Sequence, residues 1–176
     1  MEQKNSAVKK LPPFLLTAAV IFFDQWVKSF IAANWPQNSF IKDLFGNRFI
    51  EFYHVRNKAI AFSIGHNLPD MIRPALFIIL PIGVLIFLVA YYFRSDEFSP
   101  LQRWCVAGIL GGGAGNLIDR IFRPDGVVDF ISVNFYGFLG FSRFPTFNIA
   151  DSSVVIFGLL LLYTIFRSRK KDAPPQ

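Results

Sequence analysis

Four long apolar segments constrain the fold of this chain more than any other feature. They cover residues of about 12–33, 74–93, 101–122 and 151–167. A helix of about 20 residues, rising about 1.5 Å per residue, crosses the hydrocarbon core of a bilayer. Hydrophobic residues make up 53% of the 176 residues, which is too apolar for a soluble domain of this length. The sequence therefore predicts an α-helical integral membrane protein, with four transmembrane helices in a single membrane-embedded domain spanning 1–176.

Basic residues gather at the ends of the apolar segments. Lysines precede the first segment, two arginines lie in the short connection 94–103, and Arg167, Arg169, Lys170 and Lys171 follow the last. The net charge of +6 could indicate nucleic acid, but these residues form no single basic stripe, so we expect no such partner. Basic loops stay in the cytoplasm. Both termini are therefore expected to be cytoplasmic, with the longer connections 36–73 and 123–150 facing outward.

The two outer connections contain signals for extended structure. Residues 48–55, Arg-Phe-Ile-Glu-Phe-Tyr-His-Val, are rich in β-formers and follow a Gly-Asn turn signal, and a short apolar run, 59–64, comes after them. The second connection opens with a Pro-Asp-Gly turn, and residues 127–131 then read as a short strand. Its many aromatic residues are typical of a membrane interface. We expect a small outer β-sheet and an aromatic-rich outer loop.

Metal and disulfide chemistry has little support in the sequence. Cys105 is the single cysteine, and His54 and His66, the only histidines, share one loop. Intramolecular disulfides are excluded, and we expect no metal site and no cofactor.

Ionisable and amide residues fall in one layer of the predicted bundle, near its outer side. Asp24 and Lys28 share one face of the first helix, and Asn116, Asp119 and Arg120 share one face of the third. Intrahelical ion pairs are one interpretation. The third helix also contains Gly108, Gly111, Gly112, Gly113 and Gly115, which allow a helix or an extended ligand backbone to approach closely.

Two further acids, Asp129 and Asp151, belong to the same layer. Each has a structural interpretation: Asn148 and Asp151 form a potential capping box, and Asp129 can be an interfacial strand or turn acid. Together they suggest chemistry, because two carboxylates held close in a low dielectric share one proton. One would activate a water while the other protonates a peptide carbonyl. A Ser/Lys hydrolase would need Ser63, Ser132 or Ser152 beside Lys28 or Lys58, and no spacing supports it.

Five motifs, taken in order, resemble those of the signal peptidase II family, the bacterial lipoprotein signal peptidases. They are Asp24-Gln25-x-x-Lys28, Asn57 with Ala61-Phe62-Ser63, Gly111 to Arg120, Val127-Val-Asp129-Phe-Ile, and Phe147-Asn148-x-Ala150-Asp151. The match covers nearly the whole chain. One departure is visible, since Ala59 stands where the family usually has glycine, which disfavours a positive-φ turn there.

The resemblance implies an intramembrane aspartic endopeptidase that cleaves diacylglyceryl prolipoproteins immediately before the lipidated cysteine. Asp129 and Asp151 would be the catalytic pair. Asn57, Asn116, Arg120 and Asn148 would position the substrate or the pair, while Asp24, Lys28 and Asp119 would brace the helices. The expected setting is the bacterial inner membrane, with the site near the outer face and the protein surrounded by membrane lipid as a monomer.

Two other functions remain open from the residues alone. A proton-coupled transporter could use Asp24, Asp119 and Asp151 as a relay. It predicts polar residues at several depths and repeat symmetry, whereas the predicted second helix has no ionisable residue. A non-catalytic membrane scaffold would explain the helices but not the two outer acids.

Overall fold

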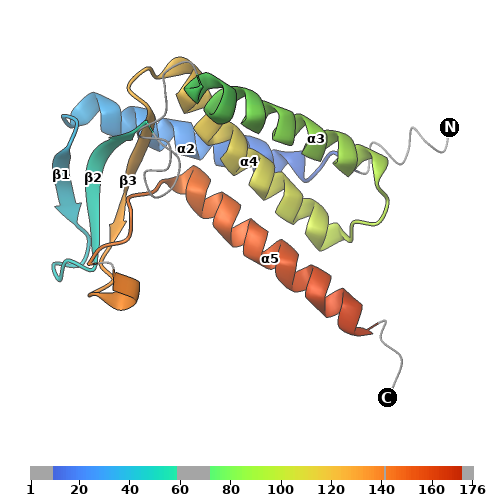
Figure 1. Ribbon diagram of the computed structural model, residues 1–176. Helices are drawn as coiled ribbons and strands as arrows, with labels where there is room; N and C mark the ends of the chain where they lie inside the picture. The colour runs from blue at the N-terminus through green and yellow to red at the C-terminus, as the bar shows by residue number, and fades with distance from the viewer. Residues whose placement is uncertain (1–9, 59–71, 141, 172–176) are drawn as a thin grey trace.

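A computed structural model describes residues 10–58, 72–140 and 142–171, and places a small sheet at one end of four long helices (Figure 1). The helices are α2 (Phe14–Asn34), α3 (Leu80–Arg94), α4 (Pro100–Phe122) and α5 (Ile149–Lys171), and a π-helical turn, η2 (Ala75–Ile79), leads into α3. The strands are β1 (Ser39–Asp43), β2 (Ile50–Asn57) and β3 (Val127–Val133), followed by the short 3₁₀ helix η3 (Phe138–Gly140). The predicted fold class is confirmed.

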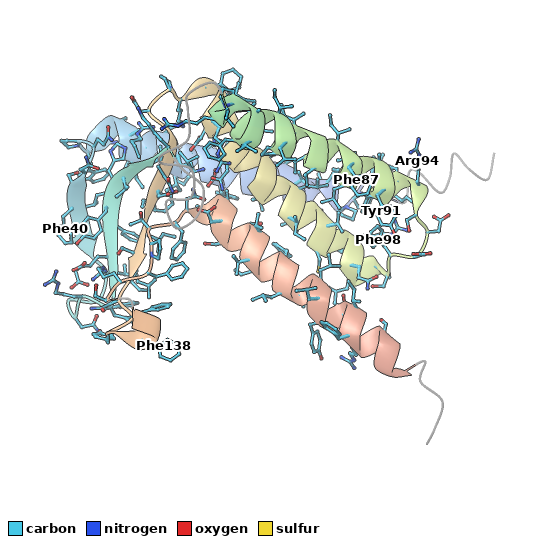
Figure 2. All side chains as sticks on the ribbon, viewed as in Figure 1. Phe40, Phe87, Tyr91, Arg94, Phe98 and Phe138 are labelled. Carbon is cyan, nitrogen blue, oxygen red and sulfur yellow. The ribbon has the colours of Figure 1, made fainter. Side chains whose placement is uncertain are left out.

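Three of these helices are long and apolar enough to cross a membrane: Phe14–Asn34, Ala75–Arg94 and Ile149–Ser168. Many of their large apolar side chains are exposed on the surface of the protein. Phe87, for example, projects from α3 and is 68% exposed in the protein alone (Figure 2). The fourth, α4, has 23 residues and is long enough, but it contacts α2, α3 and α5. Because neighbouring helices shield much of its surface from lipid, α4 tolerates more glycine and polar residues than its partners.

Glycines on α4 allow these helices to pack closely. A Cβ atom added at Gly111 would lie 3.1 Å from the carbonyl oxygen of Thr17 on α2, and one at Gly115 would lie 2.8 Å from Asp24 Oδ2. Added Cβ atoms at Gly108 and Gly112 would collide with α5. The sequence left open whether a helix or a ligand backbone approaches these glycines, and the structure places helices there.

The sheet joins strands from the two longer connections, the one between α2 and α3 and the one between α4 and α5. Its order is β1-β2-β3, with both pairings antiparallel. In the β2–β3 register, Val55 lies opposite Asp129 and Asn57 opposite Val127. Phe147 also pairs with β3: Ile131 N donates to Phe147 O at 2.8 Å, and Phe147 N donates to Ile131 O at 3.0 Å. These bonds fix the start of α5 against the strand that carries Asp129.

Helix boundaries agree with the prediction within a few residues. The largest differences are at α5, which begins at Ile149, two residues before the predicted start, and continues to Lys171. The π-helical turn precedes Pro81, which has no N–H to donate to the carbonyl of Phe77. The expected apolar run 59–64, and Ala59 with it, lie outside the residues that the structure describes.

Candidate active site

A buried lysine connects α2 to α4. Lys28 Nζ lies 2.8 Å from Asp24 Oδ2, 3.1 Å from Asp119 Oδ2 and 2.9 Å from Asn116 Oδ1. The side chains of Lys28, Asp24 and Asp119 are all 0% exposed. An ammonium group has three protons to donate, so these three acceptors satisfy it completely. The Asp24–Lys28 ion pair is intrahelical, as one interpretation expected, but it belongs to a larger group that holds two helices together.

The same two carboxylates fix the backbone beside each candidate catalytic acid. Asp24 Oδ1 accepts a hydrogen bond from Ala150 N at 2.9 Å, one residue before Asp151. Asp119 Oδ2 accepts one from Val128 N at 3.1 Å, one residue before Asp129. The buried charge cluster therefore positions the start of α5 and the strand β3 relative to each other.

Asn148 caps α5 and also contacts the strand. Its Oδ1 accepts from Asp151 N at 2.9 Å, and its backbone N donates to Asp151 Oδ2 at 3.2 Å. This confirms the predicted capping box. Its amide nitrogen Nδ2 donates to Asp129 Oδ1 at 2.7 Å and to Asn116 Oδ1 at 3.0 Å. Asn148 is 0% exposed and contacts both candidate catalytic acids, so its structural role and a role in the site coexist.

Asp129 is held in a buried position on β3. It is 2% exposed, and its second oxygen, Oδ2, accepts from Asn57 Nδ2 at 3.0 Å. Burial raises the pKa of Asp129 to about 7, because desolvation disfavours the charged carboxylate. The hydrogen bond from Asn57 opposes this shift, while the negative charge of Asp151 adds to it. Near neutral pH the carboxyl group is therefore divided between its protonated and ionised forms.

Asp151 faces α4 from the first turn of α5. Its Oδ1 accepts from Asn116 Nδ2 at 2.7 Å, so Asn116 receives a hydrogen bond from Lys28 and donates one to Asp151. Arg120, one turn further along α4, interacts electrostatically with both Asp151 and Asp129. All nine residues that the sequence singled out are thus close together at the sheet end of the bundle, although they come from five different elements, α2, β2, α4, β3 and the start of α5.

A basic cleft adjoins this site. Its volume is 320 Å³, and its wall includes Asn57, the hydrogen-bond partner of Asp129, and Arg120. The remaining lining residues are Lys58, Arg73, Pro74, Phe77, Ile78, Arg123, Pro124 and Gly126. Of the ten lining residues in the described part of the chain, four are cationic and none is acidic. The cleft therefore favours an anionic group on its polar side, while the residues of η2 provide an apolar side.

A second cavity, of 180 Å³, lies where α2 meets the sheet. Its lining residues, within the described ranges, are all apolar or aromatic: Val27, Phe30, Ile31, Trp35, Ile41, Phe52 and Phe130. Phe130 directly follows Asp129 in the strand. An apolar chain fits this environment, whereas a charged group would be left without partners.

Some supporting residues were not identified from the sequence. Arg123 pairs with Asp119 (Nε to Oδ1, 3.1 Å). Glu51 on β2 is 2% exposed and lies 2.8 Å from Arg143 Nη1 and 3.0 Å from Arg48 Nε. Arg143 Nε also donates to Ser132 Oγ at 2.8 Å. Glu51 thus fastens the segment before α5 to the sheet. No local sequence signal identifies such a contact between distant residues.

Within the described part of the chain, no group of three or more His, Cys, Asp or Glu side chains is arranged to hold a metal ion. The polar groups of the site are instead two carboxyl groups, three amides and flanking cations. Such a set can hold a water molecule, orient a carbonyl group and transfer protons.

Comparisons with known proteins agree with this arrangement. A sequence model described as Signal peptidase (SPase) II matches residues 16–167. The protein named lipoprotein signal peptidase in Treponema pallidum is 43% identical over 163 residues, covering 93% of this chain and 87% of that protein. Its counterpart in Treponema denticola is 45% identical, covering 92% and 95%. A solved structure described as a bacterial membrane enzyme has a TM-score of 0.77 at 27% identity, covering 93% of each chain. The family model matches most of this chain, and these relatives match it over most of their length. This multi-pass membrane protein therefore belongs to the signal peptidase II family.

Proposed function

We propose that this protein is an intramembrane aspartic endopeptidase. It removes signal peptides from diacylglyceryl-modified prolipoproteins by cutting immediately before the lipidated cysteine. The observation that carries this proposal is the connection of Asp129 and Asp151 through Asn148, which contacts one acid at 2.7 Å and the other at 3.2 Å. The substrate follows from membership in the family, and the pair supplies the chemistry.

In the proposed reaction, the two acids share one proton. The ionised carboxylate removes a proton from a water molecule, and the water oxygen forms a bond to the carbonyl carbon of the scissile peptide. The protonated partner donates to the carbonyl oxygen, giving a tetrahedral diol. The C–N bond then breaks as a proton passes to the leaving amine, and the products are a carboxylic acid and a free amine. The raised pKa of Asp129 supports its assignment as the proton donor near neutral pH.

The neighbouring residues have supporting roles in this proposal. Asn57 and Asn148 hold the oxygens of Asp129, while Asn116 holds Asp151. Arg120 stands at the border between the pair and the basic cleft, where it can bind the backbone carbonyl groups of a substrate. The buried cluster of Asp24, Lys28 and Asp119 keeps the strand and helix that carry the acids in register.

The membrane setting fits a lipid-bearing substrate. We place both termini in the cytoplasm and the sheet end of the bundle at the outer face, following the distribution of basic residues. Water then reaches the acids from outside the membrane. The apolar cavity lined by Phe130 is suited to bind one acyl chain of the modified cysteine. The family match favours this peptidase over a transporter or a scaffold.

The proposal is tested with the full-length protein purified in detergent and a diacylglyceryl-modified prolipoprotein, with the products identified by mass spectrometry. Asp129→Asn and Asp151→Asn should each abolish cleavage before the modified cysteine while leaving the thermal unfolding midpoint near that of the wild type. The matched control is Asp125→Asn, which changes an exposed acid in the turn before β3 and should cleave normally. Near-normal turnover by either of the first two variants would show that the pair is not catalytic.

A further inference from the structure

The described lining of the basic cleft contains four cationic side chains. They are Lys58, Arg73, Arg120 and Arg123, and no acid is among the lining residues that the structure describes. Arg123 is engaged with Asp119, and Arg120 interacts with the two catalytic acids. Lys58 directly follows β2 and is exposed, and the partly exposed Arg73 lies two residues before η2.

The cleft is also amphipathic. Phe77 and Ile78 of η2, and Pro74 directly before it, line the cleft together with the cations. Phe77 is 7% exposed, so its ring belongs to the packed wall of the cleft. A ligand that fits both parts has an apolar body and a negatively charged end. The cleft adjoins the catalytic pair through Asn57 and Arg120, so this charged end lies close to the point of hydrolysis.

We propose that the basic cleft binds the carboxyl end of the signal peptide and retains the carboxylate that hydrolysis creates there. This inference rests on the proposed function, because only a peptidase produces such a group. Hydrolysis joins the water oxygen to the acyl carbon, breaks the C–N bond and releases the amine. At neutral pH the new acid loses its proton and gains a full negative charge.

Helix electrostatics favour the same assignment. A signal peptide within the bilayer must satisfy its backbone hydrogen bonds internally, and it is therefore helical. The carboxyl end of a helix carries about half a negative charge, which cations near the last turn stabilise. Lys58 and Arg73 thus attract the uncleaved substrate weakly and the cleaved product more strongly. Because the catalytic pair holds at least one negative charge, the product carboxylate is repelled from the acids and attracted toward these two cations.

The test compares two synthetic peptides with the same signal-peptide sequence, one ending in a free carboxylate and the other in a carboxamide. Their dissociation constants for the full-length protein in detergent are measured by fluorescence titration at low salt. The carboxylate peptide should bind about tenfold more tightly, the combined effect expected of two partly solvated charge contacts. The preference should decrease at high salt, because ions screen exposed charges.

Variants show which residues cause the preference for the carboxylate peptide. Lys58→Gln should reduce it about two- to fivefold, and Lys58→Gln combined with Arg73→Gln should bring it close to one. Lys42→Gln is the matched control, because it removes one exposed charge from β1 outside the cleft, and it should retain the full preference. The inference is overturned if the wild type binds both peptides equally, or if the control loses the preference as the cleft variants do.

Both outcomes are separable from the proposed function. Peptide binding is measured without turnover, and cleavage of the lipidated prolipoprotein is measured independently. Normal cleavage with equal binding of the two peptides would overturn only the role of the cleft. Loss of the preference counts as support only for variants whose unfolding midpoint matches that of the wild type. Because Lys58 is exposed, Lys58→Gln should fold, and its binding preference can be measured even if the double variant does not fold.

Discussion

Asn148 Nδ2 lies 2.7 Å from Asp129 Oδ1, although Asn148 is also the N-cap residue of the helix that carries Asp151. One amide therefore sets the position of both acids. If α5 shifted relative to β3, the side chain could not keep the helix cap and the contact with Asp129 together. The mutual geometry of the pair is thus determined by a helix cap, which forms wherever the local backbone forms.

The first prediction separates the two roles of Asn148. Asn148→Ala removes the cap and the contact with Asp129, and it should lower stability by about 1 kcal/mol and kcat by roughly tenfold to a hundredfold. Asn148→Asp keeps a good helix cap but brings a third carboxylate against Asp129 in a buried position, so kcat should stay low although the cap of α5 is retained. Cleavage rates and thermal midpoints distinguish the two effects. Normal turnover by Asn148→Asp would show that the amide does not act on Asp129.

The second prediction concerns the buried lysine. Lys28→Met leaves Asp24 and Asp119 facing each other without their shared cation, which should cost about 3 to 5 kcal/mol of unfolding free energy. Adding Asp24→Asn removes one of the two opposed charges. The double variant should therefore be more stable than the sum of the single effects predicts. Denaturant unfolding of all four proteins measures this coupling, and strictly additive effects would contradict the shared ion pair.

The third prediction is the pH dependence of stability. The pKa of Asp129 is raised to about 7 in the folded protein, whereas that of an exposed Asp is about 3.9. The folded state therefore binds the proton more tightly than the unfolded state. Its contribution to stability is full below about pH 4 and is lost as pH rises toward 7. Asp129→Asn should flatten this part of the wild-type profile of unfolding midpoint against pH. An unchanged slope would assign the titration to other groups.

The fourth prediction is the pH dependence of cleavage. The proposed reaction needs one protonated and one ionised acid, so kcat should follow a bell-shaped curve. Its alkaline limb should begin near pH 7, where Asp129 loses its proton. Rates measured in single turnover exclude product release as the limiting step. A single-turnover rate that stays constant well above pH 7 would argue against Asp129 as the proton donor.

The fifth prediction tests how Glu51 fastens the segment before α5. Glu51→Gln removes the ion pairs with Arg143 and Arg48 while keeping the side-chain volume. The segment should detach more readily, and trypsin should cut after Arg143 several-fold faster, since local opening exposes the backbone. Glu97→Gln, an exposed position near the far end of α3, is the matched control. The rate of cutting after Arg143 is measured by mass spectrometry. Equal rates in the two variants would contradict a role for Glu51.

Much of the membrane architecture could be predicted from the sequence because it depends on local patterns. The length of the apolar segments identified the helices. The three-residue spacing of Asn148 and Asp151 identified the N-terminal cap of α5. The i, i+4 spacing identified the Asp24–Lys28 pair. Each signal acts within one or two helical turns, where chain geometry alone brings the groups together. The candidate site residues were likewise identified by residue type, depth and family resemblance.

Contacts between distant segments were decided by the tertiary structure. Three contacts join residues that are far apart in the chain. They are the pairing of β2 with β3, the ion pair of Lys28 with Asp119, and the ion pair of Glu51 with Arg143. Nothing in a local pattern specifies such partners. By itself, the sequence determined which segments enter the membrane and which polar groups must be satisfied there, because burying an unpaired charge is costly wherever it occurs. Only the packing of α4 against its neighbours decided which partner satisfies each group, since that depends on how closely the glycines let the helices approach.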